Sequence, residues 1–357
     1  MDRPSQMNGL SSQTLGPSSS PVGDSPLERS GSSAQAGLAV DLFGHPLEDN
    51  ASPSKATKRA RSGHGGEDLQ GRSVMLVDTF GLLYRVFHSM GSILCPAGRE
   101  VGATYGFVST LLDLVQRCSP DYLVAVFDVG SRNFRHDLYG DYKANRQPIP
   151  AELKQQLPML EAVLEALGVG NIGCPGFEAD DVAATLARRI ESAGGECLIV
   201  SNDKDFRQLV TERVSLYRLR GHEIWDAAAV QRDWGIRPDQ CVDYQALVGD
   251  PVDNVPGIRL VGPKLASQLL QKFGTLENVL ANAGAVSGPA RRANLLAGRE
   301  IAMLSRQLVQ LCVDVPCEMH WEEALVGRAS PAVIRELFDE LGFVQLKHRA
   351  MRLVARR

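Results

Sequence analysis

Short apolar runs that end in a carboxylate are the feature that most constrains how this chain folds. Runs at residues 74–77, 123–127 and 197–200 have the length and continuous apolar character of buried parallel strands. Helical stretches separate them, and strands that alternate with helices indicate a doubly wound, mostly parallel sheet. Sites in such sheets lie outside the carboxyl ends of the strands. We therefore expect an α/β fold whose site is lined with acids.

Nine carboxylates stand at the ends of apolar runs. If they converge, they cannot all ionise side by side without cations. Oxygen ligands with no His or Cys at matching spacing suit Mg²⁺ or Mn²⁺ rather than zinc. An acid-lined pocket that holds two such ions is the usual machinery for cleaving a phosphodiester. The nine acids are Asp78, Asp128, Glu178, Asp180, Asp181, Asp203, Asp205, Asp250 and Asp253.

Each acid group also has a simpler explanation when it is taken alone. Acids in a first helical turn, such as Glu178 and Asp181, complement the helix dipole. Asp203 can cap a helix, and the Asp250 segment is typical of a turn. Glu178 and Asp181 are three residues apart, so they share a helix face and can reach one site. Every acid group falls at a strand or helix end, where a sheet of this type has its crevice. One common site therefore explains all the acid groups better than separate local roles do.

The pattern divides the chain into three regions. Residues 1–72 are rich in Ser, Gly and Pro with Phe43 as their only aromatic residue, which predicts a disordered tail. Residues 73–225 are expected to form the α/β core, and residues 226–357 a helical subdomain. The helices expected in these regions lie at residues 101–117, 152–167, 181–193, 227–234, 240–248, 263–273, 290–311 and 331–341.

Composition limits the class of protein and its partners. The net charge is −4, but removing nine of the 42 acids leaves 33 against 38 basic residues, so a nucleic-acid partner is not excluded. Seven scattered cysteines without a CxxC pair fit a reducing compartment and argue against a zinc site. Because no run is long and apolar enough to span a bilayer, we expect no membrane partner.

A basic and aromatic segment, residues 131–150, follows Asp128 directly. Arg and Lys interleaved with Tyr and Phe suit a single-stranded nucleic acid, held by phosphate charge and base stacking. The segment also fits a solvated loop. Further along, glycines at Gly257 and Gly262 flank a turn that precedes Lys264 and an apolar helix, where backbone N–H groups can approach a phosphate.

Six motifs occur in an order that resembles the flap-endonuclease family, most closely the 5′-nuclease domain of bacterial DNA polymerase I. The resemblance runs from about Ser73 almost to the end of the chain. The motifs are DTFGLLYR from Asp78, FRH from Phe134 with YKANR from Tyr142, GFEADD from Gly176, DKD from Asp203, GDPVDN from Gly249 and the turn at residues 257–264.

The resemblance implies a PIN-like 5′-nuclease core, a helix–hairpin–helix at about residues 240–275, and a metal-dependent 5′-3′ exonuclease or flap endonuclease in DNA replication or repair. It implies that Asp78, Asp128, Glu178, Asp180 and Asp181 hold one cation, and Asp203, Asp205, Asp250 and Asp253 a second. It further implies that the segment at residues 131–150 is an arch over the site and that Arg135 and Lys143 are its catalytic basic residues. The DNA contacts are Tyr84, Arg85, Tyr142, Arg146, Gly257, Gly262 and Lys264.

The chain departs from the family at Leu260, where glycine is usual, and at Leu265, where a small hydroxyl residue is usual. A leucine at the hairpin limits how closely the backbone can approach a phosphate. We therefore expect weaker binding of duplex DNA there, and of a potassium ion that is a further candidate ligand, without an effect on the chemistry at the acids. Because the chain ends at Arg357, we expect a free-standing nuclease that acts as a monomer. A weak sliding-clamp-like motif, Asp41-Leu42-Phe43, has Ala39 where glutamine is expected.

Two rival functions follow from the same residues. A PIN-like ribonuclease shares the acid-rich sheet, although the hairpin and the second acid group favour DNA. The second rival is a non-enzymatic scaffold that binds branched DNA. The acids argue against it, because carboxylates that face phosphates do not favour binding alone. No GxGxxG follows the first strand, which argues against a dehydrogenase, and Phe80 stands where an aspartyl-nucleophile hydrolase has its second acid. We expect a bacterial cytoplasmic, nucleoid-associated protein, or an organellar or nuclear one in a eukaryote.

Overall fold

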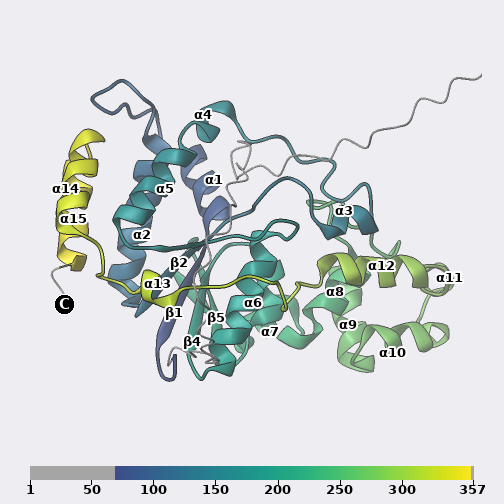
Figure 1. Ribbon diagram of the computed structural model, residues 1–357. Coiled ribbons are helices and arrows are strands. Elements are labelled where there is room, and N and C mark those ends of the chain that lie inside the picture. Colours follow the sequence, from purple (N-terminus) through teal and green to yellow (C-terminus); the bar gives the residue numbers. More distant parts are fainter. Residues whose placement is uncertain (1–68, 355–357) are drawn as a thin grey trace, which may run out of the picture. The chain divides into compact units, whose positions relative to one another are not determined.

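The computed structural model describes residues 69–354. Within them, one sheet has the strand order β3-β2-β1-β4-β5-β6 (Figure 1). All neighbours are parallel except β5 and β6, so the expected doubly wound, mostly parallel sheet is confirmed. The strands are β1 (Ser73–Asp78), β2 (Tyr122–Val126), β3 (Gly170–Ile172), β4 (Glu196–Val200), β5 (Val214–Arg218) and β6 (Glu223–Trp225).

Helices cover both faces of the sheet, because alternate strand residues point to opposite faces. Met75 and Val77 belong to the core formed with α1, α2 and α5, whereas Val74 and Leu76 belong to the core formed with α6. The helices of this region are α1 (Thr79–Ser89), α2 (Gly102–Cys118), α3 (Phe134–Leu138), α4 (Ala151–Lys154), α5 (Leu157–Ala166) and α6 (Ala179–Ser192).

The strand order reverses beside β1. The chain runs outward from β1 to β2 and β3, then returns to place β4 on the other side of β1 and continues to β5. A crevice opens at such a switch point, outside the carboxyl ends of the strands. Here the switch point lies between β1 and β4, where Asp78 ends β1 and Asp203 and Asp205 follow β4.

Two of the expected helices are interrupted in the structure. The stretch at residues 152–167 divides into α4 and α5, and Pro158 lies in the first turn of α5, where its missing N–H costs nothing. The stretch at residues 290–311 divides at Gly298 into α11 and α12. The helices after residue 225 are α7 (Ala227–Trp234), α8 (Cys241–Val248), α9 (Pro263–Phe273), α10 (Leu276–Ala281), α11 (Pro289–Ala297), α12 (Arg299–Val309), α13 (Trp321–Ala324), α14 (Pro331–Glu340) and α15 (Val344–Val354).

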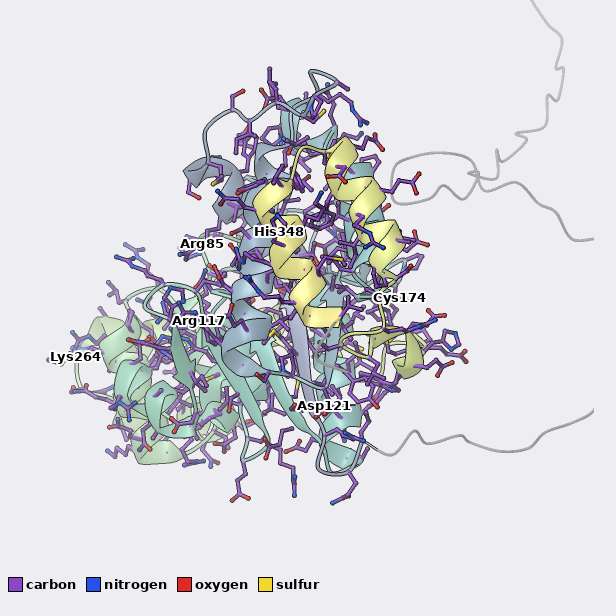
Figure 2. All side chains as sticks on the ribbon, turned by 90° about the vertical axis from the view of Figure 1, so that its left-hand side faces the viewer. Arg85, Arg117, Asp121, Cys174, Lys264 and His348 are labelled. Atoms are coloured by element: carbon purple, nitrogen blue, oxygen red, sulfur yellow. The ribbon has the colours of Figure 1, made fainter. Side chains whose placement is uncertain are left out.

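The last two helices pack on the α/β core and not on the other helices of the expected region 226–357. Ile334 and Phe338 of α14 and Leu346 of α15 share one buried cluster with residues of α2 and α5. In Figure 2 these two yellow helices, with His348, lie against the core, while Lys264 lies on the opposite, helical side. The apolar faces of α14 and α15 therefore have their partners on α2 and α5 of the α/β core, and the expected boundary between residues 225 and 226 stays a prediction.

Residues before the expected boundary at residue 73 also pack on the core. Leu69 is buried in the core beside α6, and the N–H of Gly71 donates to the carbonyl of Gly194 at 3.0 Å. The tail and its clamp-like motif, at residues 1–68, lie outside the described residues. Across residues 69–354, no helix has the length and apolar character to cross a membrane.

Candidate active site

Four acids stand at the ends of neighbouring strands, where the strand order reverses. Asp78 is the last residue of β1, Asp128 follows β2, and Asp203 and Asp205 follow β4. Asp128 accepts a hydrogen bond from the N–H of Ala179 at 2.9 Å, which ties the end of β2 to the first turn of α6. The same turn carries Glu178 and Asp180, so the acids of four segments meet at one edge of the sheet.

Burial and mutual repulsion raise the pKa values of the aspartates in this group, whereas Lys143 and Arg135 outweigh burial and lower the pKa of Glu178. Burial raises the pKa of Asp78 to about 6, and the charges of Asp203 and Asp128 add to the effect. Burial, followed by Asp203, raises the pKa of Asp205 to about 8. Burial and then Asp203 and Asp78 raise the pKa of Asp180 well above its usual value. Without cations, these aspartates therefore cannot all be ionised at neutral pH. Bound cations would favour their ionised forms.

A second acid group combines two distant segments. Oxygens of Asp205, Asp250 and Asp253 lie within 4.8 Å of one another, and all three residues are buried. Asp205 begins a 3₁₀ turn, whereas Asp250 and Asp253 lie in the turn after α8, which is closed by paired hydrogen bonds between Asp250 and Val255. Three carboxylates at this spacing form a donor set for a hard divalent cation.

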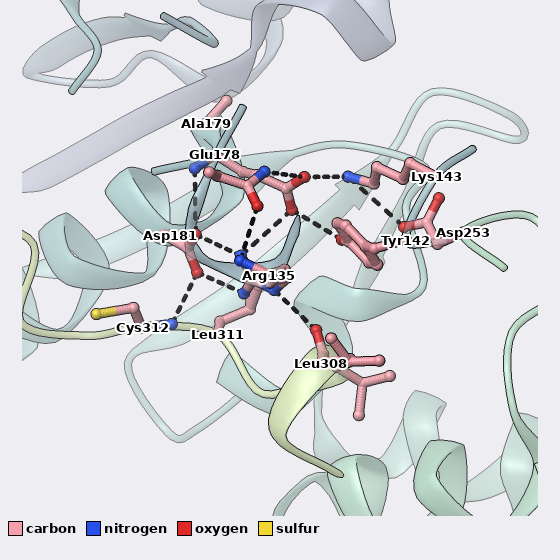
Figure 3. A network of polar contacts seen from close by, with 12 residues as sticks. Arg135, Tyr142, Lys143, Glu178, Ala179, Asp181, Asp253, Leu308, Leu311 and Cys312 are labelled. Atoms are coloured by element: carbon pink, nitrogen blue, oxygen red, sulfur yellow. Dashed lines mark hydrogen bonds and ion pairs between the residues drawn. The ribbon is translucent and has the colours of Figure 1, made fainter. Parts of the chain in front are cut away.

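Basic residues of the arch lie directly on the acids. Lys143 pairs with Glu178, and its ammonium lies 3.7 Å from Asp253. Arg146 pairs with Asp253 at 2.6 Å, and the hydroxyl of Tyr142 donates to Glu178 at 3.0 Å (Figure 3). Burial works against the charge of Lys143, but Glu178 and Asp253 raise its pKa, so this residue is a cation at neutral pH.

Local structure explains why the arch reaches the acids. Asn133 caps α3, with its side chain accepting from the N–H of Arg135 at 3.0 Å. After α3 the chain turns at Lys143, which has a φ of 55° and donates its N–H to the carbonyl of Asp253 at 3.0 Å. The backbone of the arch is therefore attached to the same turn that carries the second acid group.

Arg135 and Asp181 are paired with each other rather than with the open part of the site. Arg135 is 1% exposed, and two of its nitrogens lie 2.7 Å from the two carboxylate oxygens of Asp181, which is fully buried. Their expected roles, phosphate contact for Arg135 and cation binding for Asp181, remain predictions.

The expected DNA contacts lie in two places. Tyr84 lies near Asp128 and Arg146. Burial raises the pKa of its hydroxyl, Arg146 lowers it and Asp128 raises it, with a net upward shift. Arg85 is exposed and donates to the carbonyl of Leu219 at 3.5 Å.

The second place is the segment between α8 and α9, where the hairpin was expected. Gly257 packs so closely on α8 that a Cβ there would lie 2.1 Å from the carbonyl oxygen of Val248. Lys264 is exposed in the first turn of α9 (Figure 2). Leu265 is half-buried against the core. Leu260 is 55% exposed and has a φ of 66°, a left-handed conformation that favours glycine.

Three residues that contact the acids have no role that was predicted from the sequence. Lys204 pairs with Asp250 at 2.6 Å, and its position between two predicted acids is a signal that could have found it. Gln245 donates to Asp205 at 2.5 Å, and Asn133 donates to Glu178 at 2.9 Å. Nothing in the sequence marks these two amides, because their partners are distant in the chain.

Comparison with known families gives two adjoining matches. Residues 73–235 match the family model described as 5′-3′ exonuclease, N-terminal resolvase-like domain. Residues 236–332 match the one described as 5′-3′ exonuclease, C-terminal SAM fold. Together the two matches include the α/β core and the helices up to α13.

Curated relatives agree with these matches. A 5′-3′ exonuclease of Aquifex aeolicus is 36% identical over 270 residues, which cover 76% of this chain and 92% of that protein. A thermostable DNA polymerase I of Thermus thermophilus is 39% identical over 277 residues, 77% of this chain but only 32% of the polymerase. The chain thus spans about a third of the length of that relative.

Among solved structures, the T5 D15 flap endonuclease in complex with DNA and metal ions has the same fold. Its TM-score is 0.58 at 20% identity, and the match covers 80% of this chain and 100% of that chain.

Proposed function

Because the chain belongs to the 5′-3′ exonuclease family, we propose that it hydrolyses phosphodiester bonds at 5′ ends or 5′ flaps of DNA with two divalent cations. The observation that carries this proposal is the meeting of eight acids from separate segments beneath a basic arch. The polymerase I relatives support a role in replication or repair. Those relatives are bacterial, and we propose that the chain acts on DNA in a bacterial cytoplasm.

The donor set fits divalent cations. The acids offer carboxylate oxygens, the ligands that Mg²⁺ and Mn²⁺ prefer. Burial raises the pKa values of Asp78 and Asp205, and cations bound beside them would favour the ionised forms, which supports the proposal. When bound, two such cations activate the attacking water and neutralise charge on the attacking and leaving oxygens. We assign one cation to Asp78, Asp128, Glu178 and Asp180, and the other to Asp203, Asp205, Asp250 and Asp253.

The arch supplies fixed positive charge. Lys143 and Arg146 hold cationic groups against the acids, so a phosphate that binds there meets donors already in place. Such preorganised charge stabilises the negative charge that develops on the reacting phosphate, and loss of one donor costs about 2.7–4 kcal/mol in comparable sites. Because its pKa is raised, Lys143 acts as an electrostatic stabiliser and not as a base.

The hairpin is proposed to hold duplex DNA. Gly257, Gly262 and Lys264 form the turn into α9, where free N–H groups and a lysine can bind backbone phosphates. We also place a potassium ion here as a candidate ligand. Tyr84 and Arg85 on α1 are proposed to contact the strand near the acids.

A substrate panel tests this function. We expect purified protein with Mg²⁺ to cleave a labelled 5′-flap duplex and a recessed 5′ end, and to leave a 3′ flap and an all-RNA flap whole. Faster turnover of the RNA flap would replace the proposal with a ribonuclease. Tight binding of every branched duplex without cleavage would replace it with a DNA-binding scaffold.

A further inference from the structure

The Arg135 guanidinium makes its contacts inside the protein. Its Nε donates to the carbonyl of Leu308 at 2.7 Å, and Nη2 donates to the carbonyl of Gln310 at 3.0 Å. Nη1 and Nη2 each donate to one oxygen of Asp181 at 2.7 Å, and Nη1 also lies 3.4 Å from Glu178 (Figure 3). A guanidinium has five N–H groups. Four of them make these hydrogen bonds, and the remaining one, on Nη1, lies beside the Glu178 carboxylate.

Asp181 is equally occupied. Besides the two bonds from Arg135, one of its oxygens accepts from the N–H of Cys312 at 2.8 Å and the other from the N–H of Glu178 at 3.2 Å. A carboxylate offers about four lone-pair sites, and all four are used. With a fully buried side chain, Asp181 has no free face to offer to a cation.

The partners of this pair belong to three separate segments. Arg135 comes from α3 at the base of the arch, and Asp181 from the first turn of α6. Leu308, Gln310 and Cys312 come from the end of α12 and the chain beyond it. Bidentate pairs of this kind are strong and geometrically specific. The pair therefore fixes the arch and α12 to the same turn that carries two of the proposed cation ligands.

Building on the proposed function, we propose that Arg135 and Asp181 are a positioning pair that holds the arch over the acids and touches neither cation nor phosphate. Lys143, Tyr142 and Asn133 reach Glu178 only while α3 keeps its place on α6. Loss of the pair releases the arch and leaves the carboxylates that bind the cations intact.

The test uses Arg135→Lys and Asp181→Asn in the full chain. Lysine keeps the charge but cannot make the parallel bonds or reach both carbonyls. We expect Mn²⁺ stoichiometry and affinity, measured by calorimetry without DNA, to stay at the wild-type values. We expect faster hydrogen exchange in residues 134–146 and a fall in kcat of about 100-fold, as for displaced catalytic groups, with a smaller change in KM.

Arg189→Ala is the matched control. Arg189 also lies on α6 and bonds the segment after α12, donating to the carbonyls of Cys317 at 2.6 Å and Val315 at 2.9 Å, away from the arch. We expect it to lower stability while arch exchange and kcat remain unchanged. Equal effects of Arg135→Lys and Arg189→Ala on kcat would show that the pair is only structural.

Two further outcomes are decisive. Loss of a bound Mn²⁺, or an affinity loss of about tenfold or more, in folded Asp181→Asn would make Asp181 a ligand and overturn the proposal. If Asp181→Asn does not fold, Arg135→Lys alone tests the proposal, through the rate of hydrogen exchange in the arch and through Mn²⁺ binding. Both readouts are independent of cleavage, so a wild-type protein that cuts no DNA would refute the proposed function without deciding on the pair.

Discussion

At the scale of single residues, a hydrogen bond from Gln245 favours the ionised form of Asp205. Its amide donates to Asp205 at 2.5 Å, and this bond lowers the pKa of Asp205, which burial and Asp203 raise to about 8. In Gln245→Leu the pKa rises further, so a cation must displace a more tightly held proton. We expect calorimetry to show a loss of Mn²⁺ affinity of about 10- to 100-fold.

Gln240→Leu serves as the control for that change. Gln240 is also buried, but it donates to the carbonyls of Leu270 and Gly274 and contacts no acid. We expect this variant to lose stability and to keep its Mn²⁺ affinity. Equal losses of affinity in the two variants would mean that Gln245 acts only through the packing of α8.

Leu260 carries backbone strain that glycine would relieve. Its φ of 66° costs a non-glycine residue about 1–2 kcal/mol. We expect Leu260→Gly to raise the free energy of unfolding by up to about 1 kcal/mol, after the entropy cost of glycine, and to tighten duplex binding because the backbone can approach phosphates.

Urea unfolding and a binding titration measure both effects. Leu296→Gly, at an exposed position on α11, is expected to destabilise by about 1 kcal/mol. A Leu260→Gly variant that binds duplex more weakly would show that the leucine itself contacts DNA.

At the scale of elements, the strand ends make the metal-free protein sensitive to pH. The folded pKa values of Asp78 and Asp205, about 6 and about 8, lie above the usual 3.8. Between those limits the folded state binds more protons than the unfolded state, so the free energy of unfolding falls as pH rises. We expect the Tm in EDTA to fall between about pH 5.5 and pH 8.5.

Added Mg²⁺ is expected to reduce this fall, because cations replace the protons. Differential scanning calorimetry at several pH values, with and without Mg²⁺, makes the measurement. A Tm in EDTA that increases over the same range would contradict the clustering of these acids.

The elements that could be predicted are those with one clear pattern. Strands β1, β2 and β4 are buried on both faces and therefore appear as continuous apolar runs. Strands β3 and β6 have three residues each, and β5 alternates, so none gave a continuous run. The break at Gly298 was missed because the apolar spacing continues across it.

Some residues of the candidate site could likewise be predicted from the sequence, and others could not. Acids at strand ends could be found because each follows an apolar run. The pairing of Arg135 with Asp181 could not, since 46 residues separate them and 173 separate Arg135 from Leu308. Periodicity describes only local structure, whereas this pair depends on how three distant segments pack.

At the scale of the whole molecule, the arch links regions that the sequence keeps apart. The two family matches meet between residues 235 and 236, yet Arg135 contacts α6 on one side of that boundary and the end of α12 on the other. The hairpin lies on the helical side, whereas α14 and α15 pack on the core. If a duplex binds at the turn into α9 and a 5′ strand lies under the arch, as we propose, one connected structure would hold both.

The most direct test is rapid-quench cleavage of a 5′-labelled flap duplex by the wild-type chain and by Asp180→Asn. With Mg²⁺ we expect wild-type cleavage near the flap junction, none in EDTA, and a fall of about 1,000-fold in Asp180→Asn, which still binds the flap. A wild-type protein that binds the flap but leaves it whole with Mg²⁺ and with Mn²⁺ would contradict the proposed nuclease.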